Sequence, residues 1–99
     1  MRKIKFLEAA KMEMWQASHY YAEQKLNLGE QFLASIEAGL KLIIENPNLG
    51  SKEKLNTKKW SLKRFPYKII YSFDEEELVV AAVMHQSRNP DYWLGRLKS

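Results

Sequence analysis

The spacing of hydrophobic residues changes several times along the chain. Ile4 and Phe6 alternate with lysines, which predicts a short, half-buried strand. From Leu7 onward, apolar residues recur at intervals of three and four, the pattern of an amphipathic helix. The predicted buried stripe of this helix consists of Leu7, Ala10, Met14, Ala17 and Tyr21. A second stripe of the same period predicts a second helix and consists of Leu28, Phe32, Ile36, Leu40 and Ile43.

The segment between these stripes is short and polar enough to be a turn. Leu26 to Gly29 interrupts the first helix, and Asn27 followed by Glu30 resembles a capping box that starts the second. Asn46-Pro47 ends the second helix, because proline cannot continue it. A link of this length predicts an antiparallel helical hairpin.

The second half of the chain has the period of strands. Residues 46–56 are predicted to form a loop, and alternation then predicts strands over 59–63 and 67–73. The acidic residues 74–77 suit a hairpin turn, and the continuously apolar segment 78–84 is typical of a central strand covered on both faces. Symmetric pairing about this turn places Tyr67 and Lys68 close to Met84 and His85. Asn89-Pro90 then predicts the start of a short helix over 91–97.

Together these elements predict a single α+β domain over residues 1–99, a helical hairpin packed on one face of a small, mainly antiparallel sheet. The chain has 99 residues, the usual size of one domain. The predicted core comprises Leu33, Ile36, Leu40, Ile43, Ile69, Tyr71, Val80 and Val83.

Composition narrows the function classes. The chain has no cysteine, which excludes disulfides and thiolate metal sites and favours a reducing compartment. The N-terminus has no apolar run of signal-peptide length, and no stretch reaches the ~20 apolar residues of a membrane span. We therefore expect a soluble cytoplasmic protein without a membrane partner, and no motif calls for a cofactor or a metal.

The net charge of +4 lies entirely in the second half of the chain. Seven basic residues occur between Lys52 and Lys68 against Glu53 alone. A basic stripe beside aromatic residues indicates an anionic partner, either nucleic acid or an acidic protein. The predicted contact residues are Lys58, Lys59, Lys63, Trp93 and Arg96. The alternative interpretation, an edge strand kept soluble by lysines, stays open.

Five residues around the predicted strand ends could carry chemistry. They are Arg64, Lys68, His85, Arg88 and Tyr92. Gathered in one site, such residues could cleave RNA without a metal: His85 would transfer protons, the cations would hold the phosphate and Tyr92 would stack on a base. Structural roles are the alternative: His85 would close a strand end, Tyr92 and Trp93 would seal the core, and Arg88 would pair with Asp91 or a backbone carbonyl.

Two motifs carry a resemblance to a known family. These are Arg64-Phe65-Pro66-Tyr67-Lys68-Ile69-Ile70-Tyr71 and the run from Ala82 to Trp93. In their order and spacing they resemble the RelE/ParE superfamily of toxins from bacterial toxin–antitoxin modules, across nearly the whole chain. The family fold is similar to the one predicted above. RelE-like members cut mRNA in the ribosome, and ParE-like members inhibit DNA gyrase.

The resemblance points to both branches. Lys68 resembles a basic residue on the third strand of RelE-like toxins, and Tyr92 resembles their C-terminal tyrosine. The Arg-Phe-Pro-Tyr segment and the His-x-x-Arg-x-Pro ending look more like the ParE branch. The chain would thus be a growth-inhibiting toxin of a type II module, of the plasmid-stabilisation kind. Its activity is ParE-like gyrase inhibition without chemistry, a RelE-like endoribonuclease, or a non-toxic nucleic-acid or protein-binding module.

The resemblance also implies a partner, a cognate antitoxin encoded beside the toxin. We expect an acidic, partly disordered segment of it to fold onto the basic stripe from Lys52 to Lys68 and onto the helical pair.

Overall fold

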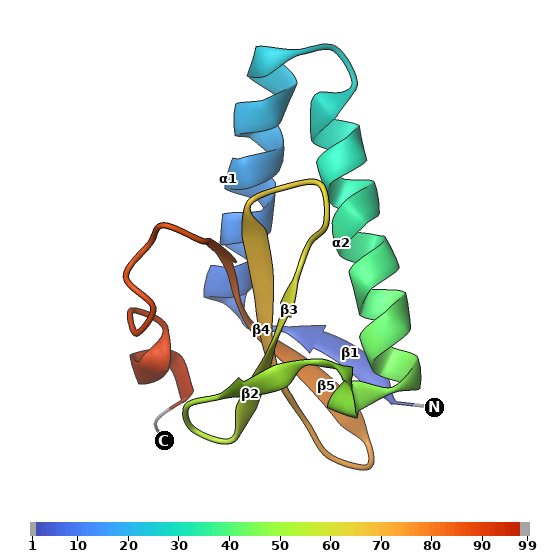
Figure 1. Cartoon of the computed structure of the whole chain (residues 1–99), viewed down its shortest axis with the longest axis vertical. Coiled ribbons are helices and arrows are strands. Elements are labelled where there is room, and N and C mark those ends of the chain that lie inside the picture. The colour runs from blue at the N-terminus through green and yellow to red at the C-terminus, as the bar shows by residue number, and fades with distance from the viewer. Residues whose placement is uncertain (1, 98–99) are drawn as a thin grey trace.

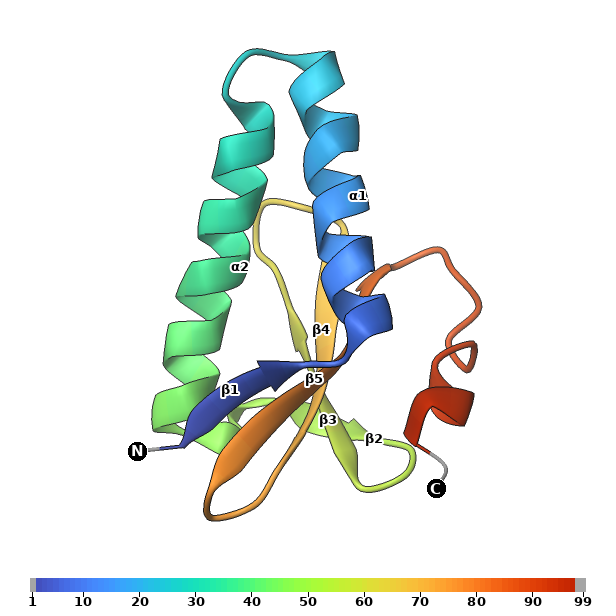
Figure 2. The ribbon, with the colours of Figure 1, turned by 180° about the vertical axis from the view of Figure 1, so that it is seen from behind.

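The computed structural model describes residues 2–97, which form a helical hairpin on one face of a five-stranded sheet (Figure 1). Their order is β1 (Lys3–Phe6), α1 (Glu8–Gln24), α2 (Leu28–Glu45), η1 (Pro47–Leu49), β2 (Ser51–Glu53), β3 (Thr57–Ser61), β4 (Tyr67–Phe73), β5 (Glu77–His85) and η2 (Leu94–Leu97). The α1–α2 hairpin extends well past the edge of the sheet, and the C-terminal segment lies beside β5 (Figures 1 and 2). The predicted α+β class is confirmed.

The sheet is mainly antiparallel, with strand order β1-β5-β4-β3-β2. Only β1 runs parallel to its neighbour, pairing with the first half of β5 from Lys3↔Glu77 to Phe6↔Val80. The β4–β5 hairpin brings Tyr67 and Lys68 close to Met84 and His85, as predicted, with Tyr67 opposite His85 and Lys68 opposite Met84. Asp74 closes its turn, because its Oδ1 accepts the backbone N–H groups of Glu76 and Glu77 at 2.8 and 2.9 Å. These bonds lower the pKa of Asp74.

A β-bulge in β5 decides which residues face the helices. Ile70 pairs with Ala82 and Tyr71 with Val80, so Ala81 is an extra residue on β5. One added residue moves every later side chain to the opposite face. Val80 and Val83 therefore both pack in the helix-side core although they lie three positions apart. Because the sequence of this strand is continuously apolar, it contains no alternation from which the change of face could be predicted.

The predicted core is confirmed on the helix side of the sheet. Ile36, Ile43, Ile69, Tyr71, Val80 and Val83 are at most 2% exposed, and Leu40 is 9% exposed. Leu33 is only half-buried and packs against the edge of this core. An aromatic cluster links the hairpin to the β3–β4 loop through Tyr21, Phe32, Phe65 and Tyr67. Phe65 and Tyr67 of the sequence motif therefore pack in the core.

The opposite face of the sheet has a second, smaller core. Trp93 is 0% exposed and packs with Ile70, Ala81, Ala82 and Met84. The C-terminal segment thus covers the face that the helices leave open. β5 is buried on both faces, as its apolar run predicted.

Three local predictions are wrong. Asn27 forms no capping box, because it adopts a left-handed conformation at φ 68° and its side chain makes no capping bond. Residues 46–56 are not all loop, since β2 pairs with β3 there. The C-terminal segment is a series of turns ending in the 3-10 helix η2 rather than an α-helix. Asn89 does cap its start, accepting the Asp91 N–H at 2.9 Å.

The loop before β2 is fixed by Tyr71. Its buried hydroxyl donates to the Pro47 carbonyl at 2.7 Å and accepts the Gly50 N–H at 3.0 Å. A Cβ at Gly50 would lie 2.6 Å from this hydroxyl, so the close approach requires glycine.

Among residues 2–97, no helix is long and apolar enough to cross a membrane. The same residues contain no group of three or more histidine, cysteine, aspartate or glutamate side chains placed to hold a metal ion.

Candidate functional site

Glu13 of α1 gathers the polar residues at the free edge of β5. Its Oε1 accepts the Val83 backbone N–H at 3.1 Å and Arg96 Nη1 at 2.8 Å. Its Oε2 accepts the Tyr92 hydroxyl at 2.5 Å, Arg96 Nη2 at 3.0 Å and Arg88 Nη1 at 3.3 Å. The side chain of Glu13 is only 10% exposed. The Glu13 carboxylate is therefore paired with groups of the same molecule.

This cluster has a structural task. No strand within residues 2–97 pairs with this edge of β5 beyond Val80, because β1 ends there. Glu13 takes the Val83 N–H at this edge, and Arg96 donates to the Ala81 carbonyl at 3.0 Å. The two side chains thus satisfy backbone groups that a strand would otherwise pair.

Tyr92 lies between two cations. The guanidinium of Arg88 sits 3.7 Å from the centre of its ring, and that of Arg96 sits 5.0 Å away. Burial, reinforced by the hydrogen bond to Glu13 and its charge, raises the pKa of Tyr92. The hydrogen bond to Glu13 also raises the pKa of Arg96. Tyr92 is consequently a neutral donor held against Glu13.

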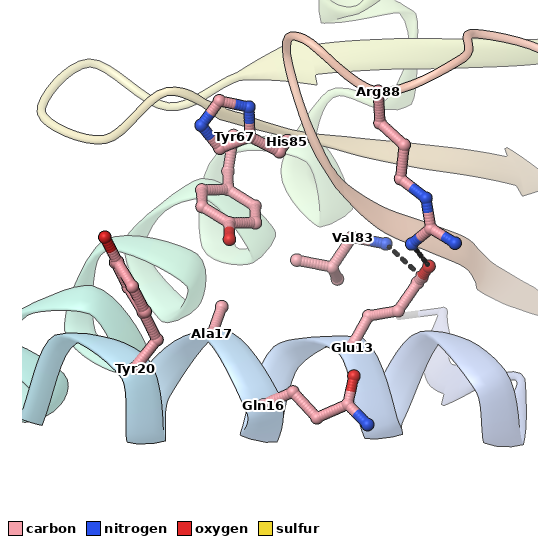
Figure 3. Close-up of a pocket in the computed structure, with 8 residues that line it drawn as sticks. All are labelled: Glu13, Gln16, Ala17, Tyr20, Tyr67, Val83, His85 and Arg88. Carbon is pink, nitrogen blue, oxygen red and sulfur yellow. Dashed lines mark hydrogen bonds and ion pairs between the residues drawn. The ribbon is translucent and has the colours of Figure 1, made fainter. Parts of the chain in front are cut away.

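A cavity of about 240 Å³ opens next to this cluster, between α1 and the ends of β4 and β5 (Figure 3). Its lining includes Glu13, Gln16, Tyr20, Tyr67, His85 and Arg88. In Figure 3 the Tyr67 ring points its hydroxyl toward α1. Burial, and then the charges of Tyr20 and Glu13, raise the pKa of Tyr67, which is therefore a hydroxyl donor at neutral pH.

His85 is at the mouth of this cavity and is oriented by Ser87. Its ring packs edge-on against Tyr67 at 5.1 Å, and its Nδ1 accepts the Ser87 backbone N–H at 3.0 Å. The Ser87 Oγ lies 2.8 Å from the same nitrogen. The neutral ring consequently carries its proton on Nε2. The Nδ1 is occupied and is not available as a base.

The structure separates the five candidate catalytic residues. Only His85 and Arg88 line this cavity, and Tyr92 is joined to it through Glu13. Arg64 lies in the β3–β4 loop, where its Nη2 donates to Gln31 of α2 at 3.3 Å. Lys68 pairs with Met84, which is buried on the face opposite the helices, so Lys68 projects from that other face. The predicted convergence of all five at one site is wrong for the described residues.

The predicted partner-contact residues are similarly divided. Trp93 is fully buried, so its prediction as a contact residue is wrong: the second face of the sheet needs an apolar cover. Arg96 forms an ion pair with Glu13, and the Nζ of Lys59 lies 3.8 Å from the Oε2 of Glu53. Lys58 is half-buried on β3, and Lys63 is exposed.

A second, larger cavity of about 440 Å³ has Lys63 and Arg64 at one end. This groove runs between the outer side of α2 and β3. Its floor is mostly apolar and consists of Ala34, Ser35, Ala38, Gly39, Leu42, Trp60 and Leu62. Neither Lys63 nor Arg64 has an ion-pair partner among residues 2–97. The groove is thus apolar along its length and cationic at one end.

Sequence reasoning missed Glu13. It lies on α1 at a position flanked by the apolar Met12 and Met14, next to the predicted buried stripe. A carboxylate beside such a stripe, in a chain with several C-terminal arginines, was the available signal. Its partners lie at least 70 positions away along the chain, and no periodicity pairs residues so distant.

Comparison with known proteins gives consistent results. Residues 4–90 match the family model described as the ParE toxin of the type II toxin–antitoxin system parDE. A solved structure titled "Chromosomal ParDE TA system from P. aeruginosa" superimposes with a TM-score of 0.68 at 18% identity, covering 86% of this chain and 96% of that one. At that identity the likeness shows the fold alone. A search among curated proteins found no match.

Proposed function

The chain belongs to the ParE toxin family of type II toxin–antitoxin systems, and we propose from this that it arrests growth by binding DNA gyrase rather than by cleaving RNA. The family membership supports the toxin role and the existence of an antitoxin partner. The choice of gyrase rests on the likeness to the ParE branch and on the geometry of the candidate site.

The dispersal of the candidate catalytic residues carries this choice. Phosphoryl chemistry on RNA needs an acid, a base and cations within hydrogen-bond reach of one phosphate. Here Arg64 and Lys68 lie away from His85, on another loop and on the opposite face. Arg88 and Tyr92 are bound to Glu13. Such an arrangement suits a protein-binding surface better than a nuclease centre.

The mRNA endonuclease is the second candidate. One observation favours it: His85 and Arg88 line the same cavity, with the His85 Nε2 free of the bond that holds Nδ1. In that version the imidazole serves as an acid and Arg88 holds the phosphate. His85→Ala would then lower cleavage by roughly 10²–10⁴-fold.

We propose the α2–β3 groove as the antitoxin's principal contact. Its apolar floor suits a short amphipathic segment, and its free cations Lys63 and Arg64 suit acidic residues at one end of that segment. This narrows the expected contact from the whole basic stripe to the part of it that borders α2. Lys58 of β3 would extend the contact along the sheet.

Induced expression with two readouts tests the function. A gyrase inhibitor should trigger the DNA-damage response in cells and inhibit supercoiling by purified gyrase, with intact mRNA. Cleaved mRNA in translating ribosomes, with gyrase unaffected, would overturn the proposal in favour of the endonuclease. Co-expression of the neighbouring open reading frame should restore growth and co-purify with the chain, whereas the absence of both effects would contradict the antitoxin assignment.

A further inference from the structure

The cavity between α1 and the ends of β4 and β5 holds hydrogen-bond donors that the fold does not use. Within residues 2–97 the hydroxyls of Tyr20 and Tyr67, the amide of Gln16 and the Nε2 of His85 make no hydrogen bond that the structure records. Tyr20 and Tyr67 come from α1 and β4 and both line the cavity (Figure 3). Donors gathered from separate elements without an internal acceptor are typical of a binding site.

The charge balance around the cavity favours an anion. Among residues 2–97, Glu13 is the only carboxylate that lines the cavity, and five donor groups surround it. Arg88 and Arg96 together exceed its charge by one unit. Arg88 uses Nη1 on Glu13 and keeps its remaining N–H groups, with a side chain 54% exposed. The site therefore has room for one further negative charge.

Arg88 is also held in position. Its guanidinium is stacked at 3.7 Å on Tyr92 and tied to Glu13, so little side-chain freedom remains to be lost on binding. The rings of Tyr20 and Tyr67 offer flat walls for a methylene stem. A volume of about 240 Å³ is enough to take up one amino-acid side chain.

We propose that this cavity binds the carboxylate of one aspartate or glutamate side chain on the toxin's protein target. The identification of that target as gyrase rests on the proposed function, whereas the chemistry of the site does not. A nucleic-acid backbone is a poorer fit, because binding a polyanion needs several free cations. In the part of the chain that the structure describes, Arg88 is the only cation that lines the cavity, and it is shared with Glu13.

An NMR titration of the isotopically labelled full chain tests the ligand class directly. The probes are N-acetyl-glutamate amide, the neutral N-acetyl-glutamine amide and inorganic phosphate. The glutamate probe should shift the signals of Gln16, Tyr20, Tyr67, His85 and the Arg88 Nε–H in a saturable way, with a Kd on the order of millimolar. The glutamine probe should bind roughly tenfold more weakly, because it lacks the charge that Arg88 recognises.

A matched pair of variants locates the binding. Tyr67→Phe keeps the ring that packs against Phe32 and His85 but removes the hydroxyl, and should weaken the glutamate probe about tenfold. Tyr21→Phe removes a hydroxyl from the same aromatic cluster outside the cavity lining and should leave the affinity unchanged. Folding of both variants is checked by their amide spectra.

Three results would overturn the inference. These are equal binding of the glutamine probe, stronger binding of phosphate at the same signals, or shifts confined to the basic stripe from Lys52 to Lys68. A gyrase assay separates this inference from the proposed function. If the wild type inhibits gyrase and folded Tyr67→Phe inhibits it equally, the cavity inference fails and the function stands. If the glutamate probe binds as expected and gyrase is unaffected, the site stands and the target is another protein.

Discussion

Two basic regions of this molecule look alike in sequence and differ in structure. At the edge of β5, Arg88 and Arg96 converge on Glu13, which is 10% exposed and accepts five hydrogen bonds. At the end of the α2–β3 groove, Lys63 and Arg64 are exposed and no carboxylate among residues 2–97 pairs with them. The first region has one counter-charge inside the fold for its two arginines, and the second has none among the described residues.

The difference shows how to interpret a basic side chain. A cation paired with a buried carboxylate mainly stabilises the fold, and removing one partner leaves the other charge uncompensated. An unpaired surface cation contributes little to stability and acts through long-range attraction that salt screens. Removing the buried carboxylate of the first region should therefore change stability, and substituting the unpaired cations of the second should change binding alone. Four predictions test this division.

The largest effect is expected at Glu13. Glu13→Gln should lower the free energy of unfolding by about 3–5 kcal/mol, because the arginines keep their charge and lose their counter-charge. Denaturant unfolding at neutral pH measures it. Glu37→Gln is the control, since Glu37 only meets Lys41 at 3.8 Å with both side chains over 70% exposed, and should change the value by less than about 0.5 kcal/mol. If Glu13→Gln lowers the free energy of unfolding by less than ~1 kcal/mol, the cluster does not stabilise the fold.

The second prediction concerns the cations of the groove. Lys63→Glu combined with Arg64→Glu should weaken antitoxin binding about 10- to 100-fold at low salt, with a smaller difference at high salt. Stability should stay within ~0.5 kcal/mol of the wild type. Lys3→Glu combined with Lys5→Glu on β1, at the edge of the sheet far from the groove, makes the same change in net charge and is the control. Equal weakening by this control pair would show that total charge, not the groove, attracts the antitoxin.

The third prediction concerns the shape of the groove. Ala38 is exposed and lines the floor, so Ala38→Trp should fill the space and reduce antitoxin affinity about tenfold by steric exclusion. The melting temperature should be close to that of the wild type. Ala9→Trp places the same ring at an exposed position of α1 outside the groove and should bind normally. Unchanged affinity in both variants would exclude the groove as the contact.

The smallest effect is a change in pH dependence at Tyr92. Folding raises the pKa of this phenol, so the folded chain holds the proton more tightly than the unfolded chain does. Its contribution to stability is therefore complete below pH ~10, the unfolded pKa, and is lost as the pH rises further. Tyr92→Phe should make the fall in unfolding free energy above pH ~10 less steep. Denaturation at several alkaline pH values measures the slope, and an unchanged slope would contradict the assignment.

Local patterns in the sequence determined most of the fold. Spacings of three and four marked α1 and α2, and alternation marked β4, because helices and strands repeat over a few residues. The hairpin turn at residues 74–77 predicted that Tyr67 and Lys68 lie close to Met84 and His85, and the bulge then shifted the pairing by one residue, to Tyr67 opposite His85. The family motif lay in the same half of the chain and supported the same architecture.

The site depended on information that a local pattern does not contain. The bulge at Ala81 turned Val83 and His85 toward α1, and an apolar run gives no sign of such a change. Lys68 and His85 lie on the paired strands β4 and β5, and Arg64 lies in the loop before β4. Side chains alternate between the two faces along a strand, so Lys68 projects from the face opposite the helices, away from His85. The C-terminal turns placed Arg96 beside Glu13, 83 positions away.

The α+β class, the helical hairpin, the core and the excess of positive charge can be predicted from the sequence, since each follows from composition or from a short repeat. Which of those positive charges have an ion-pair partner follows from the tertiary structure alone. Glu13 pairs with the two arginines that reach it, and no carboxylate among residues 2–97 pairs with Lys63 or Arg64. That division depends on distances between residues far apart in the chain, and it is set when α1, β5 and the C-terminal segment pack together.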